Sequence, residues 1–167
     1  MNTVYCEYFK SVKDIKKPPV ILLDIQMGNL FLPRLIGYKL AQMGINSLIV
    51  ELPVFGTLNR KIKGGKLPSS LDSIGQLISQ GINDIRVAAS ILNQLENTED
   101  INLCGISFGA LVGALYAGID GNLKKVCLLL GGGNLSEIIK REENFNKILK
   151  EGNFSEGMLK FLMIPFD

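Results

Sequence analysis

The stretch that decides the fold is INLCGISFG, residues 101–109. Residues 101–106 form a short apolar run of strand length, and residues 108–117 are small and apolar, as in a helix that packs closely on a sheet. Between them, Gly105-Ile106-Ser107-Phe108-Gly109 fits the pattern G-x-S-x-G. The pattern therefore lies directly after a predicted strand and directly before a predicted helix.

A serine in such a turn has the setting of a nucleophile. The sharp reversal from strand to helix strains the backbone of the central residue and presents its side chain at the carboxyl edge of the sheet. Gly105 and Gly109 remove Cβ atoms that would clash in this turn. The helix that follows directs free N–H groups at the serine, so the backbone N–H of Phe108 can stabilise an oxyanion. We take Ser107 as the candidate nucleophile and Gly105 and Gly109 as its flanking glycines.

The rest of the chain alternates apolar runs with helical patterns, which predicts an α/β fold: a three-layer, mostly parallel sheet with crossover helices on both faces. We expect residues 20–25 and 101–106 to be neighbouring central strands. The first helix, residues 32–43, offers an apolar face made of Leu35, Ile36, Leu40 and Met43. Strands are predicted at 3–9, 20–25, 47–50, 101–106 and 126–130, and helices at 32–43, 71–95, 108–117 and from 134 onward.

This order of elements resembles the α/β-hydrolase superfamily, which includes esterases, lipases and dienelactone hydrolases, over residues 18–133. The turn Gln26-Met27-Gly28-Asn29 stands where the family places its oxyanion loop. The resemblance implies hydrolysis of a carboxylic ester or similar acyl bond by Ser107, with the backbone N–H groups of Phe108 and Met27 as oxyanion donors. Asp24-Ile25 stands where the family usually carries a His-Gly or glycine-rich signature.

The family's general base is missing, because the sequence contains no histidine. The family's order is serine, then an acid, then histidine, with the last two on later strands. Lys124 and Lys125 fall at the amino-terminal end of their strand, out of reach of Ser107. The acids that follow Ser107, none of them after a convincing later strand, are Asp120, Glu137, Glu142, Glu143, Glu151, Glu156 and Asp167.

We therefore expect this chain alone to be inactive and to be the amino-terminal part of a hydrolase. Residues 1–167 would form one incomplete domain with a truncated α/β-hydrolase fold, and 134–167 would start a lid or connecting segment. One alternative is a catalytically inert binding or scaffold protein on a shortened hydrolase fold that closes the edge of strand 126–130 by self-association. A further alternative is a membrane-associated protein with a helix at 101–119, a stretch without charge in which glycines recur at four-residue spacing.

The composition of the chain argues against some classes of binding partner. A net charge of +2, with 7% aromatic residues and no tryptophan, argues against nucleic acid. Residues 1–10 lack the apolar run of a signal peptide, so a cytoplasmic location is expected.

Cys6, Cys104 and Cys127 stand in apolar stretches and are expected to be buried thiols, without metal or cofactor. The expected partners are a small-molecule ester or acyl substrate if the protein is active, a second copy, or a complementing carboxyl-terminal fragment, with no nucleic acid and no membrane.

Overall fold

The computed structural model describes residues 3–13, 16–25, 29–53, 71–120 and 122–131. The predicted oxyanion-loop residues Met27 and Gly28 lie outside the described residues, as does the predicted helix and lid segment 134–167. The described residues form three helices and a five-stranded sheet. They are β1 (Cys6–Phe9), β2 (Val20–Leu23), α1 (Phe31–Gln42), β3 (Ser47–Val50), α2 (Leu71–Glu96), β4 (Ile101–Ile106), α3 (Phe108–Asp120) and β5 (Leu123–Leu129).

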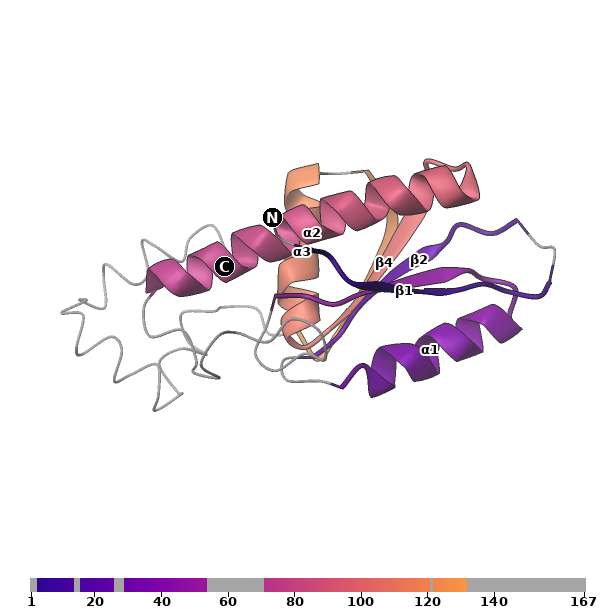
Figure 1. Cartoon of the computed structure of the whole chain (residues 1–167), viewed down its shortest axis with the longest axis horizontal. Helices are drawn as coiled ribbons and strands as arrows, with labels where there is room; N and C mark the ends of the chain where they lie inside the picture. The colour runs from indigo at the N-terminus through magenta and orange to yellow at the C-terminus, as the bar shows by residue number, and fades with distance from the viewer. Residues whose placement is uncertain (1–2, 14–15, 26–28, 54–70, 121, 132–167) are drawn as a thin grey trace.

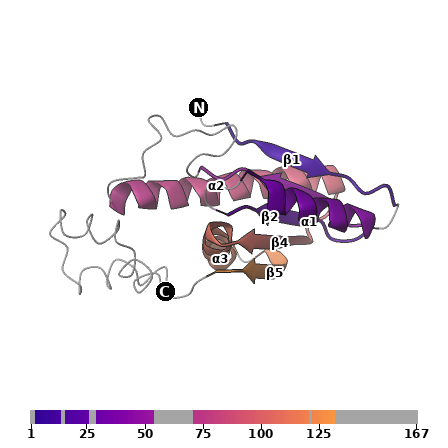
Figure 2. The same cartoon turned by 90° about the horizontal axis from the view of Figure 1, so that it is seen from below.

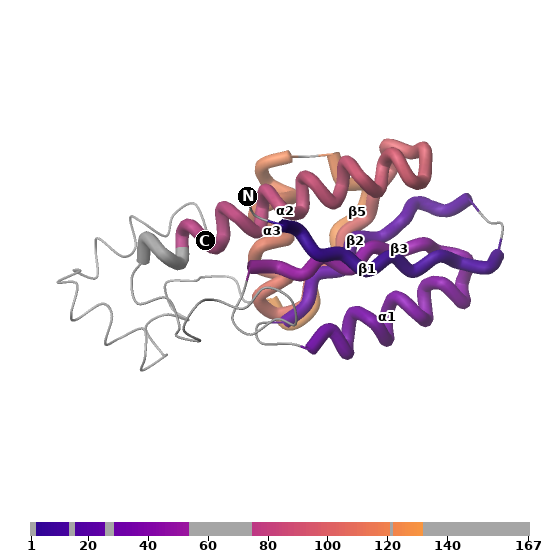
Figure 3. The backbone as a smooth tube through the Cα atoms, in the orientation of Figure 1, coloured from indigo at the N-terminus to yellow at the C-terminus, as the bar shows by residue number. Residues whose placement is uncertain are grey.

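The sheet is mixed and has the strand order β1-β3-β2-β4-β5. β1 pairs antiparallel with β3, and the other neighbours are parallel. Figure 1 shows α1 on one face of the sheet and α2 on the other, and Figure 2 shows β1 and β5 at the two outer edges. Figure 3 shows α1 and α2 on opposite sides of the strands, and in the strand order β3 and β4 flank β2. The predicted three-layer α/β architecture is confirmed.

The two strands predicted to be central neighbours do pair in parallel. Val20 lies opposite Asn102, and Leu23 lies opposite Gly105. Because both strands run in the same direction, their carboxyl ends meet at one edge of the sheet. Ser107 follows β4 directly at that edge.

Alternate side chains of β2 enter two apolar clusters on the two faces of the sheet. Ile21 and Leu23 pack with residues of α2 and α3 in one cluster, and Val20 and Leu22 pack with Leu30 in the other. Each fully buried leucine or isoleucine contributes about 2 kcal/mol relative to exposure. β2 is buried on both faces, which explains its uninterrupted apolar sequence.

The predicted face of α1 is partly wrong. Leu35 is 46% exposed and Met43 is 58% exposed, whereas Ile36 and Leu40 do pack against the core. The most deeply buried positions of the helix are instead Pro33 and Gly37. A Cβ atom on Gly37 would lie 3.2 Å from the ring of Phe9, so the missing side chain allows α1 to approach β1 closely.

The membrane alternative is wrong for this stretch. Residues 101–106 are the strand β4 and α3 is a separate helix, because the chain reverses at Ser107. Among the described residues, no helix has both the length and the apolar character that a membrane crossing requires.

The expectation of three buried thiols is also wrong. Cys6 and Cys127 are exposed, and only Cys104 is half-buried. The two exposed cysteines lie on the edge strands, where fewer neighbours cover a side chain. β5 exposes apolar side chains along its length, up to 83% at Leu130 just beyond its end, and no described strand pairs with its outer edge.

Candidate active site

Ser107 occupies a strained backbone conformation between β4 and α3. Its φ is 51°, in the left-handed region that residues with a side chain rarely adopt. Backbone hydrogen bonds hold it there: the Ser107 N–H donates to the Leu129 carbonyl at 2.8 Å, and the Ser107 carbonyl accepts from the Ala110 N–H at 2.9 Å. The strand β5 and the first turn of α3 thus jointly impose the turn.

The two flanking glycines stand where backbone segments come closest. A Cβ atom on Gly105 would lie 2.3 Å from the carbonyl oxygen of Gly109, and one on Gly109 would lie 2.6 Å from the carbonyl oxygen of Asp24. Neither backbone atom can move without displacing an element. The Gly109 N–H also donates to the Asp24 carbonyl at 3.1 Å, so α3 begins in direct contact with the end of β2.

The start of α3 leaves a donor beside Ser107. Phe108 is the first residue of the helix, and its N–H has no hydrogen-bond acceptor among the described residues. Unpaired N–H groups in the first turn carry the positive end of the helix dipole. Ser107 and Phe108 are both half-buried, so an anionic group at Ser107 can be reached from outside and would face this N–H.

The Asp24 side chain holds the backbone between β2 and α1. It accepts hydrogen bonds from the Ile25 N–H at 2.8 Å and from the Leu30 N–H at 2.9 Å. The residue is 7% exposed, and this burial raises the pKa of its carboxyl, while the two backbone donors act in the opposite direction. One carboxylate therefore links the end of β2 to the start of α1, across the segment where the oxyanion loop is predicted.

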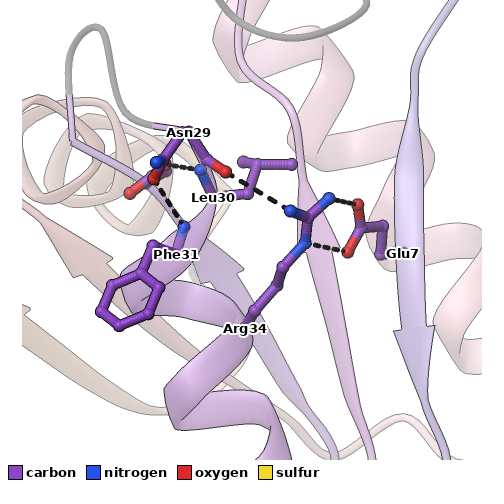
Figure 4. Close-up of polar contacts among 6 residues, drawn as sticks. Glu7, Asn29, Leu30, Phe31 and Arg34 are labelled. Atoms are coloured by element: carbon purple, nitrogen blue, oxygen red, sulfur yellow. Dashed lines mark hydrogen bonds and ion pairs between the residues drawn. The ribbon is translucent and has the colours of Figure 1, made fainter.

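A second set of polar contacts secures the start of α1 (Figure 4). The Arg34 guanidinium forms a two-point pair with the Glu7 carboxylate, one bond being 2.8 Å, and the Asn29 side chain accepts from the Phe31 N–H at 3.1 Å. The hydrogen bond from Arg34 lowers the pKa of Glu7. Leu30 itself has a φ of 63°, so a second left-handed residue directs the chain into α1.

The site brings together Gly105, Ser107, Phe108 and Gly109 with the backbone of Asp24. The Asp24 carboxyl accepts hydrogen bonds from Ile25 and Leu30, and the sequence offers no histidine as a base. Lys124 and Lys125 lie near the amino-terminal end of β5, and Ser107 lies beyond the carboxyl-terminal end of the neighbouring strand β4. Lys124 pairs there with Asp100.

Two other features of the described residues lie apart from this turn. Asp120 pairs with Arg86 at the far end of α3. A cavity of about 70 Å³ is lined by residues of β1 and β3 together with Glu51 and Leu30. Ser107 does not line that cavity.

Ser107→Gly is expected to raise the free energy of unfolding by about 1 kcal/mol, because glycine adopts a positive φ without steric strain. Ser107→Ala retains the strain and should change stability by less than about 0.5 kcal/mol. The matched control is Ser90→Gly on the exposed face of α2, which should destabilise by about 0.5 kcal/mol. Urea unfolding followed by circular dichroism distinguishes these results. A destabilised Ser107→Gly protein would contradict the strained turn.

Sequence reasoning identified the serine and its glycines but missed the role of Asp24. A lone acid at the end of an uninterrupted apolar strand was the available signal, because a buried carboxylate needs hydrogen-bond donors. The Leu129 carbonyl, which fixes the Ser107 N–H, could not be found from sequence, since backbone atoms carry no residue-specific signal.

Comparisons with known proteins identify structures of similar fold. Neither the protein-family models nor the curated protein sequences gave a match. Among solved structures, the chain is similar to acetyl xylan esterase 1 from Thermoanaerobacterium sp. JW/SL YS485, with a TM-score of 0.69 and 14% identity over 98% of this chain and 58% of that one. It is similar to Est1E from Butyrivibrio proteoclasticus, with a TM-score of 0.62 and 16% identity over 82% of this chain and 52% of that one.

A third similar structure is a putative dienelactone hydrolase from Klebsiella pneumoniae, with a TM-score of 0.55 and 16% identity over 91% of this chain and 82% of that one. The chain spans little more than half the length of the two esterases. The strand order, the turn after β4 and these likenesses agree: the chain has the α/β-hydrolase fold.

Proposed function

We propose that Ser107 is the nucleophile of a serine hydrolase that cleaves carboxylic esters or similar acyl bonds. The observation that carries the proposal is the left-handed turn at Ser107, beside which the Phe108 N–H has no acceptor among the described residues. In the reaction, Ser107 Oγ attacks the acyl carbon, its proton passes to a base, and the developing oxyanion accepts a hydrogen bond from Phe108. The backbone N–H of Met27 is the second proposed donor.

We further propose that this chain is the amino-terminal part of that enzyme, acting in the cytoplasm. The base and its acid partner then come from polypeptide outside these 167 residues, which contain no histidine. Two observations support this: the chain spans 58% and 52% of the two similar esterases, and β5 exposes Val126, Leu128 and Leu129. An apolar edge of this kind suits a further strand, supplied by a complementing carboxyl-terminal segment.

The isolated chain is expected to show negligible turnover of p-nitrophenyl acetate. Removal of the base from a serine hydrolase lowers kcat by on the order of 10⁶-fold, because the hydroxyl keeps its proton. Release of p-nitrophenol is measured against Ser107→Ala, which should match the wild-type chain. A Ser107-dependent burst followed by sustained turnover would show that the chain contains a substitute base.

The sequence encoded directly downstream of codon 167 distinguishes an incomplete enzyme from an inert protein. A reading frame with two further strands, an acid and then a histidine is expected, and co-expression of that segment should give ester turnover that Ser107→Ala abolishes. Unrelated sequence downstream, together with a stable self-associated protein, would contradict the proposal and favour a binding or scaffold protein.

A further inference from the structure

Two cysteines face each other on neighbouring strands. Cys104 of β4 lies in register with Cys127 of β5. Side chains at paired positions of adjacent strands point to the same face of a sheet, so the two thiols lie side by side on one face. The third cysteine, Cys6, lies on β1 at the opposite edge of the sheet. The fold therefore singles out one pair of thiols.

The spacing of the strands suits a covalent bond between these thiols. Adjacent strands lie about 4.8 Å apart, within the range of about 4.4–6.8 Å that Cα atoms of a disulfide span, and formation of the bond requires the two Cβ atoms to approach to about 3.8 Å. β5 is the edge strand, and no described strand holds its outer side, so small adjustments remain possible there. Cys127 is exposed and Cys104 is half-buried, so a reagent from solution reaches Cys127 first.

We propose that Cys104 and Cys127 form a reversible intramolecular disulfide when the protein meets a hydroperoxide such as hydrogen peroxide. With hydrogen peroxide, the sulfur of Cys127 attacks one peroxide oxygen; an S–O bond forms, the O–O bond breaks, and the departing hydroxide takes the Cys127 proton and leaves as the first water. The sulfur of Cys104 then attacks the sulfur of Cys127, an S–S bond forms, the S–O bond breaks, and the second water leaves with the Cys104 proton. Two thiols are oxidised and one peroxide is reduced.

The environment of the pair agrees with this order of events. Burial and the neighbouring Cys127 raise the pKa of Cys104 to about 11, so its thiol stays protonated at neutral pH and is not the first to react with peroxide. The described residues contain no cluster of three or more histidine, cysteine or acidic side chains suited to a metal ion. Two thiols without further ligands suit a disulfide better than a four-ligand zinc site.

The bond would join β4 to β5 next to the serine turn. Cys104 precedes Ser107 by three positions in the chain, and Leu129, whose carbonyl holds the Ser107 N–H, follows Cys127 by two. Oxidation therefore fastens the two strands that impose the turn. The disulfide requires no reaction at Ser107, so it stands or falls independently of the proposed hydrolase function.

The test is a mass-spectrometric map of the native chain after brief exposure to hydrogen peroxide and alkylation of the remaining thiols with N-ethylmaleimide. Trypsin cleaves after Arg86, Lys124 and Lys125, so Cys104 and Cys127 fall in separate peptides, 87–124 and 126–140. The expected product is these two peptides joined, two hydrogen atoms lighter than their sum, and separated again by dithiothreitol.

Cys6→Ser is the matched control, since it removes an exposed thiol and leaves the pair; it should give the same yield of joined peptides. Cys127→Ala should give none. A Cys127 sulfinic acid beside an alkylated Cys104, a bond to Cys6, or joined peptides found only in a dimer on non-reducing gel electrophoresis would overturn the proposal.

A second measurement needs no variant. Phenylarsine oxide, which binds paired thiols, should protect Cys104 and Cys127 of the wild-type chain from alkylation while Cys6 stays reactive. Equal alkylation of all three cysteines would contradict the pairing even if the variants failed to fold.

Discussion

Gly109→Ala is expected to lower the free energy of unfolding by about 3 kcal/mol, because the added Cβ would meet backbone atoms on a neighbouring strand. The nearest are the carbonyl oxygen of Asp24 at 2.6 Å and the carbonyl carbon of Leu23 at 2.8 Å. Relief would require α3 to move away from β2, which breaks the hydrogen bond from the Gly109 N–H and displaces Ser107.

Two further glycines of α3 provide a graded comparison. A Cβ on Gly113 would meet the end of the Leu103 side chain at 2.8 Å, and a side chain can rotate, so Gly113→Ala should lose only about 1 kcal/mol. Nothing lies within 4 Å of the position on Gly118, where alanine should gain about 0.5 to 1 kcal/mol from helix propensity.

Urea unfolding followed by far-ultraviolet circular dichroism suits this chain, which has no tryptophan. The order of stability Gly118→Ala, then Gly113→Ala, then Gly109→Ala is the result expected. A Gly109→Ala protein as stable as the Gly113→Ala protein would contradict the close approach of α3 to β2.

Asp24→Ala is expected to lower the free energy of unfolding by about 3 kcal/mol at neutral pH. The substitution leaves the N–H groups of Ile25 and Leu30 without their acceptor, and an unsatisfied buried donor costs about 1 to 3 kcal/mol. Asp24→Asn retains one acceptor oxygen and should lose about half as much. The matched control is Asp100→Ala, at an exposed ion pair with Lys124, which should change stability by less than about 0.5 kcal/mol.

The pH dependence of the Asp24→Asn effect reports the state of the carboxyl. Burial raises the pKa of Asp24 above its ordinary value of 3.8. A group with a raised folded pKa contributes stability that is fully present below the unfolded pKa and is lost as the pH rises through the folded pKa. The wild-type chain should therefore gain stability relative to Asp24→Asn as the pH falls from neutral toward 3.8. A difference that shrinks over this range would contradict the raised pKa.

The order of the elements and the sheet neighbours could be predicted because the signals are local and repeated. The apolar runs at β2, β3 and β4 are too short and too continuous for surface helices, and the helical patterns between them require crossover connections. The ends of the strands were less accurate: β2 ends at Leu23 rather than Ile25, and β5 begins at Leu123 rather than Val126.

The orientation of α1 could not be predicted from its apolar spacing. Phe31, Leu35 and Tyr38 share one side of the helix and are all exposed, while the helix packs through Gly37. Apolar periodicity predicts that the helix face with the large apolar residues packs against the core. Close packing of α1 depends instead on the absence of a side chain. The prediction that Cys127 is buried failed for a related reason. An apolar sequence does not distinguish a strand at the edge of a sheet from a strand buried in its middle.

The part of the candidate site that lies within the G-x-S-x-G motif could be predicted from the sequence. Ser107 and its glycines carry a spacing that follows from the geometry of the turn, so the sequence was sufficient. Asp24 acts through hydrogen bonds to backbone groups, which any sequence supplies, and its partner Leu30 owes its place to a left-handed φ. Such contacts depend on the path of the chain, and only the structure reveals them.

β2 lies in the middle of the sheet, although it is translated before both of its neighbours, β3 and β4. β1, β2 and β3 can pair once residue 50 has emerged, but the other edge of β2 must wait for β4, which ends at Ile106. At about 5 to 20 residues per second, translation leaves that apolar edge open for several seconds. During this interval, pairing with another nascent chain competes with folding. The hydrogen bond from the Ser107 N–H to the Leu129 carbonyl can form only after β5 has also been synthesised.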